Sequence, residues 1–168
     1  MCGKETIAFG ADVTLTGEGV LAGKLTLKTA NIAGAVTGGT FAVAGRVNSF
    51  TARTFVDSAF LAGFVPTNLT GPFGGGIFTP GGKVNAFRVV GVKGSADPAF
   101  SNSSVAAGLL GTVSLKSIGA DNGGRKYGLL VEDGLTRLKV TSPALALKGV
   151  IADPVLSDLF GEFELRVS

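Results

Sequence analysis

A glycine followed by a short segment of alternating apolar and polar residues recurs along this chain, and this repetition constrains the fold more than any other feature. The segment Gly45-Arg-Val-Asn-Ser-Phe50 returns almost unchanged as Gly82-Lys-Val-Asn-Ala-Phe87. Further units of the same kind begin at Gly23, Gly111, Gly134 and Gly161. Alternation with a period of two is the pattern of a β-strand that buries one face. The chain is therefore expected to be all-β.

A second, shorter repeat lies between these units. The segment Phe55-Val-Asp-Ser-Ala-Phe-Leu-Ala-Gly63 resembles Phe100-Ser-Asn-Ser-Ser-Val-Ala-Ala-Gly108, and each follows a Gly-x-Val-Asn unit. Order is thus repeated as well as content, as in successive turns of a coil. We predict a parallel β-solenoid in which Phe50 stacks on Phe87 in the core.

The spacing between the glycines of these units is irregular, and variable corner loops account for it. Loops run over the surface and tolerate insertions. The extra residues have loop chemistry, as in Pro66 to Pro80 and in Asp121-Asn-Gly-Gly124. An antiparallel β-sandwich is the main alternative, since many short strands with Gly and Pro turns also suit it. Hairpin signals are sparse, with Asn122-Gly123 the best candidate, so the solenoid is preferred.

The length of 168 residues is that of one domain, and we divide it into three parts. Residues 1–22 are expected to form an N-terminal rung or cap, residues 23–140 the repeat core, and residues 141–168 a C-terminal rung with a short helix. That helix is predicted between Asp153 as its N-cap and Gly161 as its stop.

Composition narrows the range of partners. Only 16% of the residues are charged, whereas about 25% is usual for a soluble domain, so the chain is either rich in buried strand or has neighbours that cover some of its surface. The 15 Lys and Arg residues are scattered along the sequence and are not bunched into a run, which argues against a nucleic-acid groove. No run approaches the ~18 apolar residues of a membrane helix, so no membrane span is predicted. Cys2 is the single cysteine, which excludes a disulfide within the chain.

The residues available for chemistry argue against an enzyme. Histidine is absent, which removes His-based acid–base catalysis and the commonest zinc ligand. Glu162 and Glu164 project to one side of a predicted strand about 7 Å apart, as a pair of glycosidase carboxylates does. We interpret them as a solvated face on which Arg166 offsets their repulsion. No catalytic residues are assigned.

Two other site classes are also disfavoured. The glycines around Gly75 and the triplet Gly81-Gly82-Lys83 are interpreted as tight corners, because neither fits the spacing of a phosphate-binding loop. Asp57 and Asp121 lie near Gly-rich turns but lack the regular spacing of calcium-binding acids. No metal and no cofactor are therefore predicted.

The aromatic residues point instead to a docking loop. Phe73 and Phe78 lie in a Gly- and Pro-rich loop, so they either fold back over the coil or form an exposed contact patch. The loop from Phe64 to Pro80 is where we expect a partner to dock, with Phe64, Phe73 and Phe78 as the candidate binding residues.

Residues 23–140 resemble a known class of repeats. The segments that carry the resemblance are Gly82-Lys-Val-Asn-Ala-Phe87, Ser103 to Leu115, Asp121-Asn-Gly-Gly-Arg-Lys-Tyr-Gly128 and Leu135-Thr-Arg-Leu-Lys-Val140. They are similar to the β-helical repeats of very large bacterial surface or secreted proteins. The resemblance implies a right-handed parallel β-helix in an adhesin-like setting, extracellular or at the cell surface. It supplies no catalytic or binding residues.

These observations together predict a non-catalytic structural or adhesive module. The last strand, from Gly161 to Ser168, has no polar cap after it, which suggests self-assembly or contact with neighbouring repeats. The expected partner is protein, either a copy of the chain or a neighbouring repeat, and polysaccharide is the second choice. A carbohydrate-binding module and a polysaccharide lyase-like or hydrolase-like β-helix remain as alternatives.

Overall fold

The structure is a computed structural model that describes residues 8–18, 23–68, 72–142, 145–149 and 161–167. These residues form strands and one 3-10 turn, with no α-helix among them, and no described helix is long and apolar enough to cross a membrane. The helix predicted from Asp153 falls in residues 150–160, outside the described part. The elements are β1 (Ala8–Phe9), β2 (Val13–Leu15), β3 (Leu25–Thr37), β4 (Thr40–Val43), β5 (Arg46–Val56), β6 (Ala59–Ala62), β7 (Phe64–Pro66), η1 (Pro72–Gly74), β8 (Gly76–Phe78), β9 (Lys83–Val89), β10 (Phe100–Ser101), β11 (Ser104–Leu115), β12 (Tyr127–Ser142), β13 (Leu145–Gly149) and β14 (Phe163–Val167).

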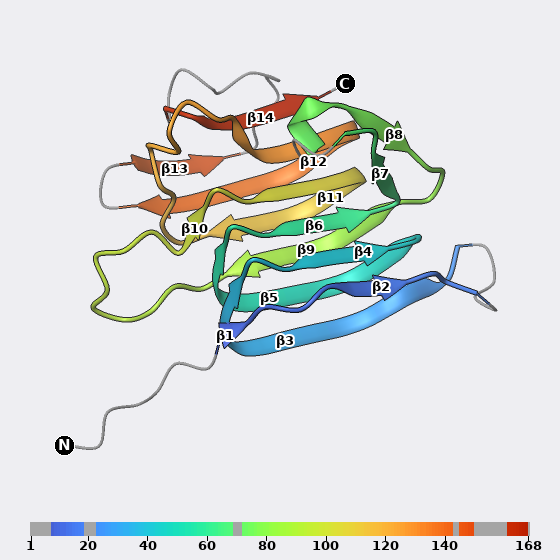
Figure 1. Cartoon of the computed structure of the whole chain (residues 1–168), viewed down its shortest axis with the longest axis horizontal. Coiled ribbons are helices and arrows are strands. Elements are labelled where there is room, and N and C mark those ends of the chain that lie inside the picture. Colours follow the sequence, from blue (N-terminus) through green and yellow to red (C-terminus); the bar gives the residue numbers. More distant parts are fainter. Residues whose placement is uncertain (1–7, 19–22, 69–71, 143–144, 150–160, 168) are drawn as a thin grey trace.

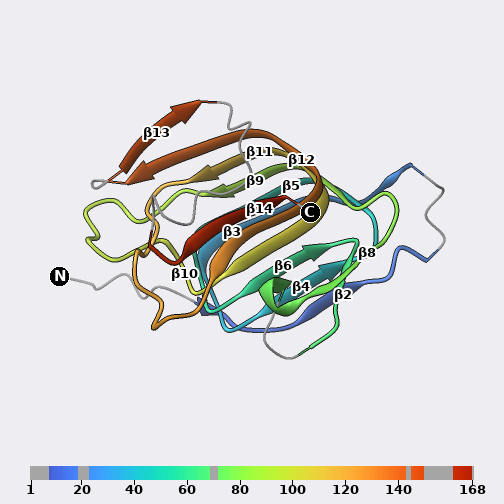
Figure 2. The same ribbon diagram turned by 90° about the horizontal axis from the view of Figure 1, so that it is seen from above.

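One curled, largely parallel sheet contains most of these strands. Its main path runs β1-β3-β5-β9-β11-β6-β4-β2, and β12 lies beyond β11. The sheet curls within β11, because residues 104–107 pair with β6 while residues 109–115 pair with β9. The result is an open half-barrel with two limbs that face each other across the core (Figures 1 and 2).

We call these two halves the β6 limb and the β9 limb. The β6 limb contains β2, β4, β6, β14 and the first parts of β11 and β12. The β9 limb contains β3, β5, β9 and the second parts of β11 and β12. Within the described residues, antiparallel pairing is confined to β7 with β8 and β12 with β13. The antiparallel β-sandwich is therefore wrong, and the all-β, parallel part of the prediction is confirmed.

The closest repeat in the sequence stacks in register. Arg46, Val47 and Phe50 of β5 lie opposite Lys83, Val84 and Phe87 of β9. The Phe50 and Phe87 rings are 5.2 Å apart with an interplanar angle of 7°, so the predicted stacking is confirmed. Identical side chains stack because parallel strands in register place equivalent positions beside one another.

The second repeat also stacks in register. Phe100 lies opposite Phe55, and the segment 104–107 lies opposite 59–62. The turn between them repeats as well, since Asp57 and Asn102 both have positive φ, at 50° and 44°. The Asn102 side-chain amide donates to the Asp57 carboxylate at 2.5 Å. Asp and Asn are the residues, besides glycine, that tolerate this conformation best, which explains their place in the repeat.

The alternation of the β9 limb differs from the expected period of two. In β5, Val47, Phe50 and Ala52 are buried, so two consecutive residues, Asn48 and Ser49, face outward. The same spacing recurs in β9, where Val84, Phe87 and Val89 are buried. The outward-facing Asn48 and Asn85 are therefore neighbours on adjacent strands, and the Asn85 side-chain amide donates to Asn48 Oδ1 at 3.2 Å.

The predicted units that begin at Gly23, Gly111 and Gly161 do not stack in the register that their glycines suggest. Gly161 lies in the turn before β14, which pairs with Tyr127–Val131 in the β6 limb rather than with the β9-limb units. Leu27 of β3 lies opposite Val47 of β5, which lies opposite Val84 of β9, which in turn lies opposite Leu110 of β11. Aligning the sequence units by Gly23 and Gly111 would instead place Leu27 at the position of Leu115. Residue class alone was misleading here, because alternating apolar and polar segments look alike at several offsets.

The core lies between the limbs and is rich in phenylalanine. Phe50 of β5 contacts Phe60 of β6 across the interior, with ring centroids 4.7 Å apart, and Phe60 contacts Phe87 at 5.5 Å. All three rings are fully buried. Aromatic pairs of this kind contribute roughly 0.5–1.5 kcal/mol each beyond the burial of their area, so they hold the two limbs together.

Candidate functional site

The predicted docking loop folds back onto the outer face of the β6 limb. Its strands β7 and β8 form an antiparallel hairpin in which Phe64 lies opposite Phe78 and Val65 lies opposite Ile77. We call β7, η1 and β8 together the hairpin segment. Of the two outcomes considered for this loop, folding back over the sheet is the one observed.

The aromatic side chains of the hairpin segment cover a second apolar cluster. Phe64 is only 5% exposed, while Phe73 and Phe78 are half-buried. They pack with outward-facing residues of β6, β11 and β12, namely Leu61, Ala106 and Leu130. This cluster explains why those strands carry apolar residues on both faces, since the hairpin segment shields the outer one.

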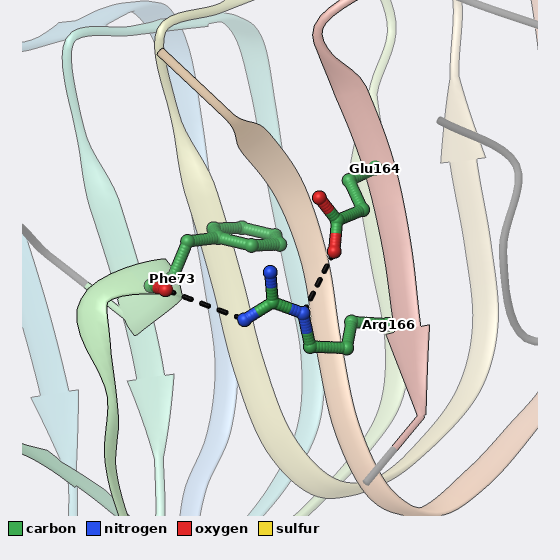
Figure 3. A network of polar contacts seen from close by, with 3 residues as sticks. All are labelled: Phe73, Glu164 and Arg166. Carbon is green, nitrogen blue, oxygen red and sulfur yellow. Dashed lines mark hydrogen bonds and ion pairs between the residues drawn. The ribbon is translucent and has the colours of Figure 1, made fainter. Parts of the chain in front are cut away.

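Arg166 of β14 fastens the hairpin segment to the sheet (Figure 3). Its Nε donates to Glu164 Oε1 at 2.7 Å, and its Nη1 donates to the backbone carbonyl of Phe73 at 3.3 Å. The guanidinium carbon also lies 5.3 Å from the centroid of the Phe73 ring, within cation–π range. Glu164 is nearly buried, so its charge needs this partner.

The exposed surface of the hairpin segment is different from the one the sequence indicated. Val65 and Ile77 are 58% and 63% exposed and lie opposite each other, on the side away from the buried Phe64. Alternation along two short antiparallel strands produces this division. The pairing of Val65 with Ile77 was not visible in the sequence, because the hairpin itself was not predicted.

The candidate carboxylate pair is held by structural contacts. The Glu162 side chain accepts hydrogen bonds from the backbone N–H groups of Asn122 and Gly124, and so fixes the turn at residues 121–124. Glu164 pairs with Arg166, as predicted. The predicted solvated face is wrong for Glu164, however, because this residue is only 8% exposed. Each carboxylate therefore stabilises a neighbouring segment of the chain.

Tyr127 lies next to this turn and is buried at 1% exposure. Its hydroxyl donates to the carbonyl of Gly119. Burial, and secondarily the negative charge of Glu162, raise the pKa of the Tyr127 hydroxyl well above its usual value near 10. The neutral, hydrogen-bonded form of this side chain is thus a structural element of the β6 limb.

The glycine-rich and acidic turns have local roles. A Cβ on Gly82 would lie 2.4 Å from the carbonyl oxygen of Ala62, so glycine is required there for close backbone approach. Asp57 bonds to Asn102 in the turn described above. Among the described residues, no three Cys, Asp or Glu side chains converge as metal ligands would.

Comparison of the chain with known protein families, with characterised proteins and with solved structures finds no match.

Proposed function

We propose that this chain is a non-catalytic structural module of a parallel β-helix, which associates through the open edge formed by β2 and β3. The observation that carries the proposal is the contrast in burial along the stack. Interior side chains of the first strands, such as Leu15 and Leu27, are half-buried, whereas their neighbours Val43 and Val47 are 2% and 0% exposed.

The pairing of short segments between the limbs supports a coil. The last residues of β3 pair with β1 on one side and with the last residues of β5 on the other, and β5 then pairs with β10. Phe100 of β10 bridges in parallel to Ile118. These parallel pairs stack successive segments between the two limbs, which supports a coil. The right-handed, closed form of that coil is part of the proposal.

The edge of the first strands supports association. Within the described residues, β2 pairs only with β4, and β3 pairs with β5 and, at its end, with β1. Unpaired N–H and C=O groups beside half-buried apolar side chains are a template for another strand. The sequence predicts an open end at Gly161 to Ser168 as well, and within the described residues β14 pairs only with β12. The β2–β3 edge is preferred because Leu15 and Leu27 are half-buried, whereas Phe163 and Leu165 of β14 are 0% and 1% exposed.

The proposed partner of this edge is a further coil turn, supplied by a second copy of the chain or by a neighbouring repeat. The resemblance to bacterial surface repeats supports an adhesin-like role outside the cell. The structural use of Glu162 and Glu164 supports the absence of catalysis, because both carboxylates are engaged within the protein.

Sedimentation velocity over a wide concentration range tests this proposal. We expect the chain to associate as concentration rises, and the variant Leu27→Lys to remain monomeric because its charge would enter the apolar contact. Asn31→Lys is the matched control, since Asn31 is exposed on the same strand. Circular dichroism checks that both variants are folded.

A wild-type chain that remains monomeric at every concentration would overturn the proposal, and this measurement does not depend on the folding of either variant. Equal loss of association in Asn31→Lys would also overturn it.

A further inference from the structure

The fold gathers basic residues that are scattered in the sequence onto one surface. Along the β9 limb, the strand segments 25–32, 46–53, 83–89 and 134–141 contain Lys or Arg but neither Asp nor Glu, and the segment 109–115 contains no charged residue. The inward positions of these segments are apolar, so the charged side chains lie on the outward face. The outward face of these segments therefore carries only positive charge, and Asp133 lies at its edge, beside Gly108.

Strand register sets the spacing of these cations. Arg46 lies directly opposite Lys83. Arg88 and Lys139 flank Ser114 from β9 and β12, so they are two strand spacings apart, or about 10 Å. Arg137 lies beside Thr112 in the next column of outward residues.

Among the described residues, no carboxylate forms an ion pair with these cations. The one ion pair of the described residues joins Arg166 to Glu164 in the β6 limb. Arg88, Arg137 and Lys139 are exposed. The Arg46 guanidinium donates to the backbone carbonyl of Gly23 at 2.6 Å. Like charges on directly opposed positions destabilise a sheet, so the repulsion between Arg46 and Lys83 still costs some stability. A bound anion would offset it.

The side chains between the cations identify the class of anion. Hydroxyl and amide groups alternate with the charges, as at Asn48, Thr51 and Asn85. Aromatic rings are absent from the outward positions of these segments, since Phe50 and Phe87 point into the core. Proteins that bind single-stranded nucleic acid hold the bases largely by stacking them on aromatic rings. This face has no such rings on which bases could stack. Charge and hydroxyl complementarity remain, which suit an acidic polysaccharide.

We propose that the outward face of the β9 limb binds an extended acidic polysaccharide, carboxylated or sulfated, through Arg46, Arg53, Lys83, Arg88, Arg137 and Lys139, which we call the basic face. This surface is separate from the β2–β3 edge, so binding here does not depend on the association proposed above. From β5 to β12 the basic face crosses three strand spacings, about 14 Å, enough for several charged sugars.

Titration calorimetry of the full chain with polygalacturonate, heparin and dextran at low salt tests the proposal. We expect the two anionic polymers to bind and neutral dextran not to bind. Affinity should fall steeply as salt is added, because the contacts are between exposed charges.

A pair of charge-matched variants locates the site. Arg88→Gln with Lys139→Gln removes two cations from the basic face, and Arg125→Gln with Lys126→Gln removes two exposed cations from the loop before β12. The first should weaken polygalacturonate binding by about tenfold, which lies within the range expected for two exposed ionic contacts, and the second by less than about twofold.

Three results would overturn the proposal. They are no binding of either anionic polymer at low salt, equal losses in the two double variants, and tighter binding of single-stranded polydeoxythymidine than of the polysaccharides at the same salt. Sedimentation of the same samples shows separately whether the chain associates.

Discussion

At the scale of single residues, two buried serines hold the turn that joins the β9 limb to the β6 limb. Ser103 Oγ accepts a hydrogen bond from the backbone N–H of Ser58 at 3.1 Å, and it lies within donor distance of the carbonyls of Phe55 and Ser101. In the same way, Ser58 Oγ accepts a hydrogen bond from the backbone N–H of Gly39, which lies in the preceding connection between the limbs, from β3 to β4. The Asp/Asn-Ser pair in the repeat thus has a structural cause, because each serine satisfies the backbone of the turn below it.

Ser103→Ala should destabilise the protein by about 1–3 kcal/mol, because the Ser58 N–H would be left buried without its partner. Ser104→Ala is the control, since Ser104 is half-buried and its hydroxyl makes no bond in the described structure. Urea unfolding followed by circular dichroism measures both. Equal effects of the two changes would show that the buried bond contributes little.

At the scale of elements, the repeats predicted strand pairing well and the insertion poorly. The Phe55 and Phe100 units, like the Gly45 and Gly82 units, were matched residue for residue, and such matches specify register because a slip by one residue would reverse the faces. The hairpin segment has no second copy to match. The sequence therefore indicates Phe64, Phe73 and Phe78 as candidate binding residues, but it does not show that their side chains face the sheet.

The gathering of cations was missed for a related reason. Arg46 and Lys83 are 37 positions apart in the sequence, and only their equivalence in the repeat places them side by side. Arg88, Ser114 and Lys139 become neighbours through register across three strands. The sequence lacks local runs of charge, but such runs are a poor guide to a charged surface whose residues are far apart in the sequence.

The hairpin segment should open when its fastening is removed. Arg166→Gln breaks the pair with Glu164 and the contact with the Phe73 ring, so amides in β7 and β8 should exchange faster with deuterium. Exchange in β5 and β9 should be unchanged, because their contacts lie in the Phe core. Arg125→Gln is the matched control, and faster exchange throughout the sheet would contradict a local role for Arg166.

At the scale of the whole molecule, stability should depend on pH in a way that reflects Tyr127, the single tyrosine of the chain. Its folded-state pKa is raised by burial above the usual value near 10, so the native form retains the proton when the unfolded form has lost it. The unfolded state then binds fewer protons, and the free energy of unfolding falls by about 1.4 kcal/mol per pH unit above pH 10. Below pH 10 this contribution is fully present.

Tyr127→Phe separates this effect from the titration of lysines, because both proteins contain the same lysines. The variant loses the hydrogen bond to Gly119 and should be less stable than wild type at pH 8. The difference between the two should narrow as pH rises above 10, since only wild type must retain a buried proton to stay folded. Denaturant unfolding at pH 8, 10 and 11 measures this difference, and a constant gap across that range would mean that the Tyr127 hydroxyl can ionise within the folded sheet.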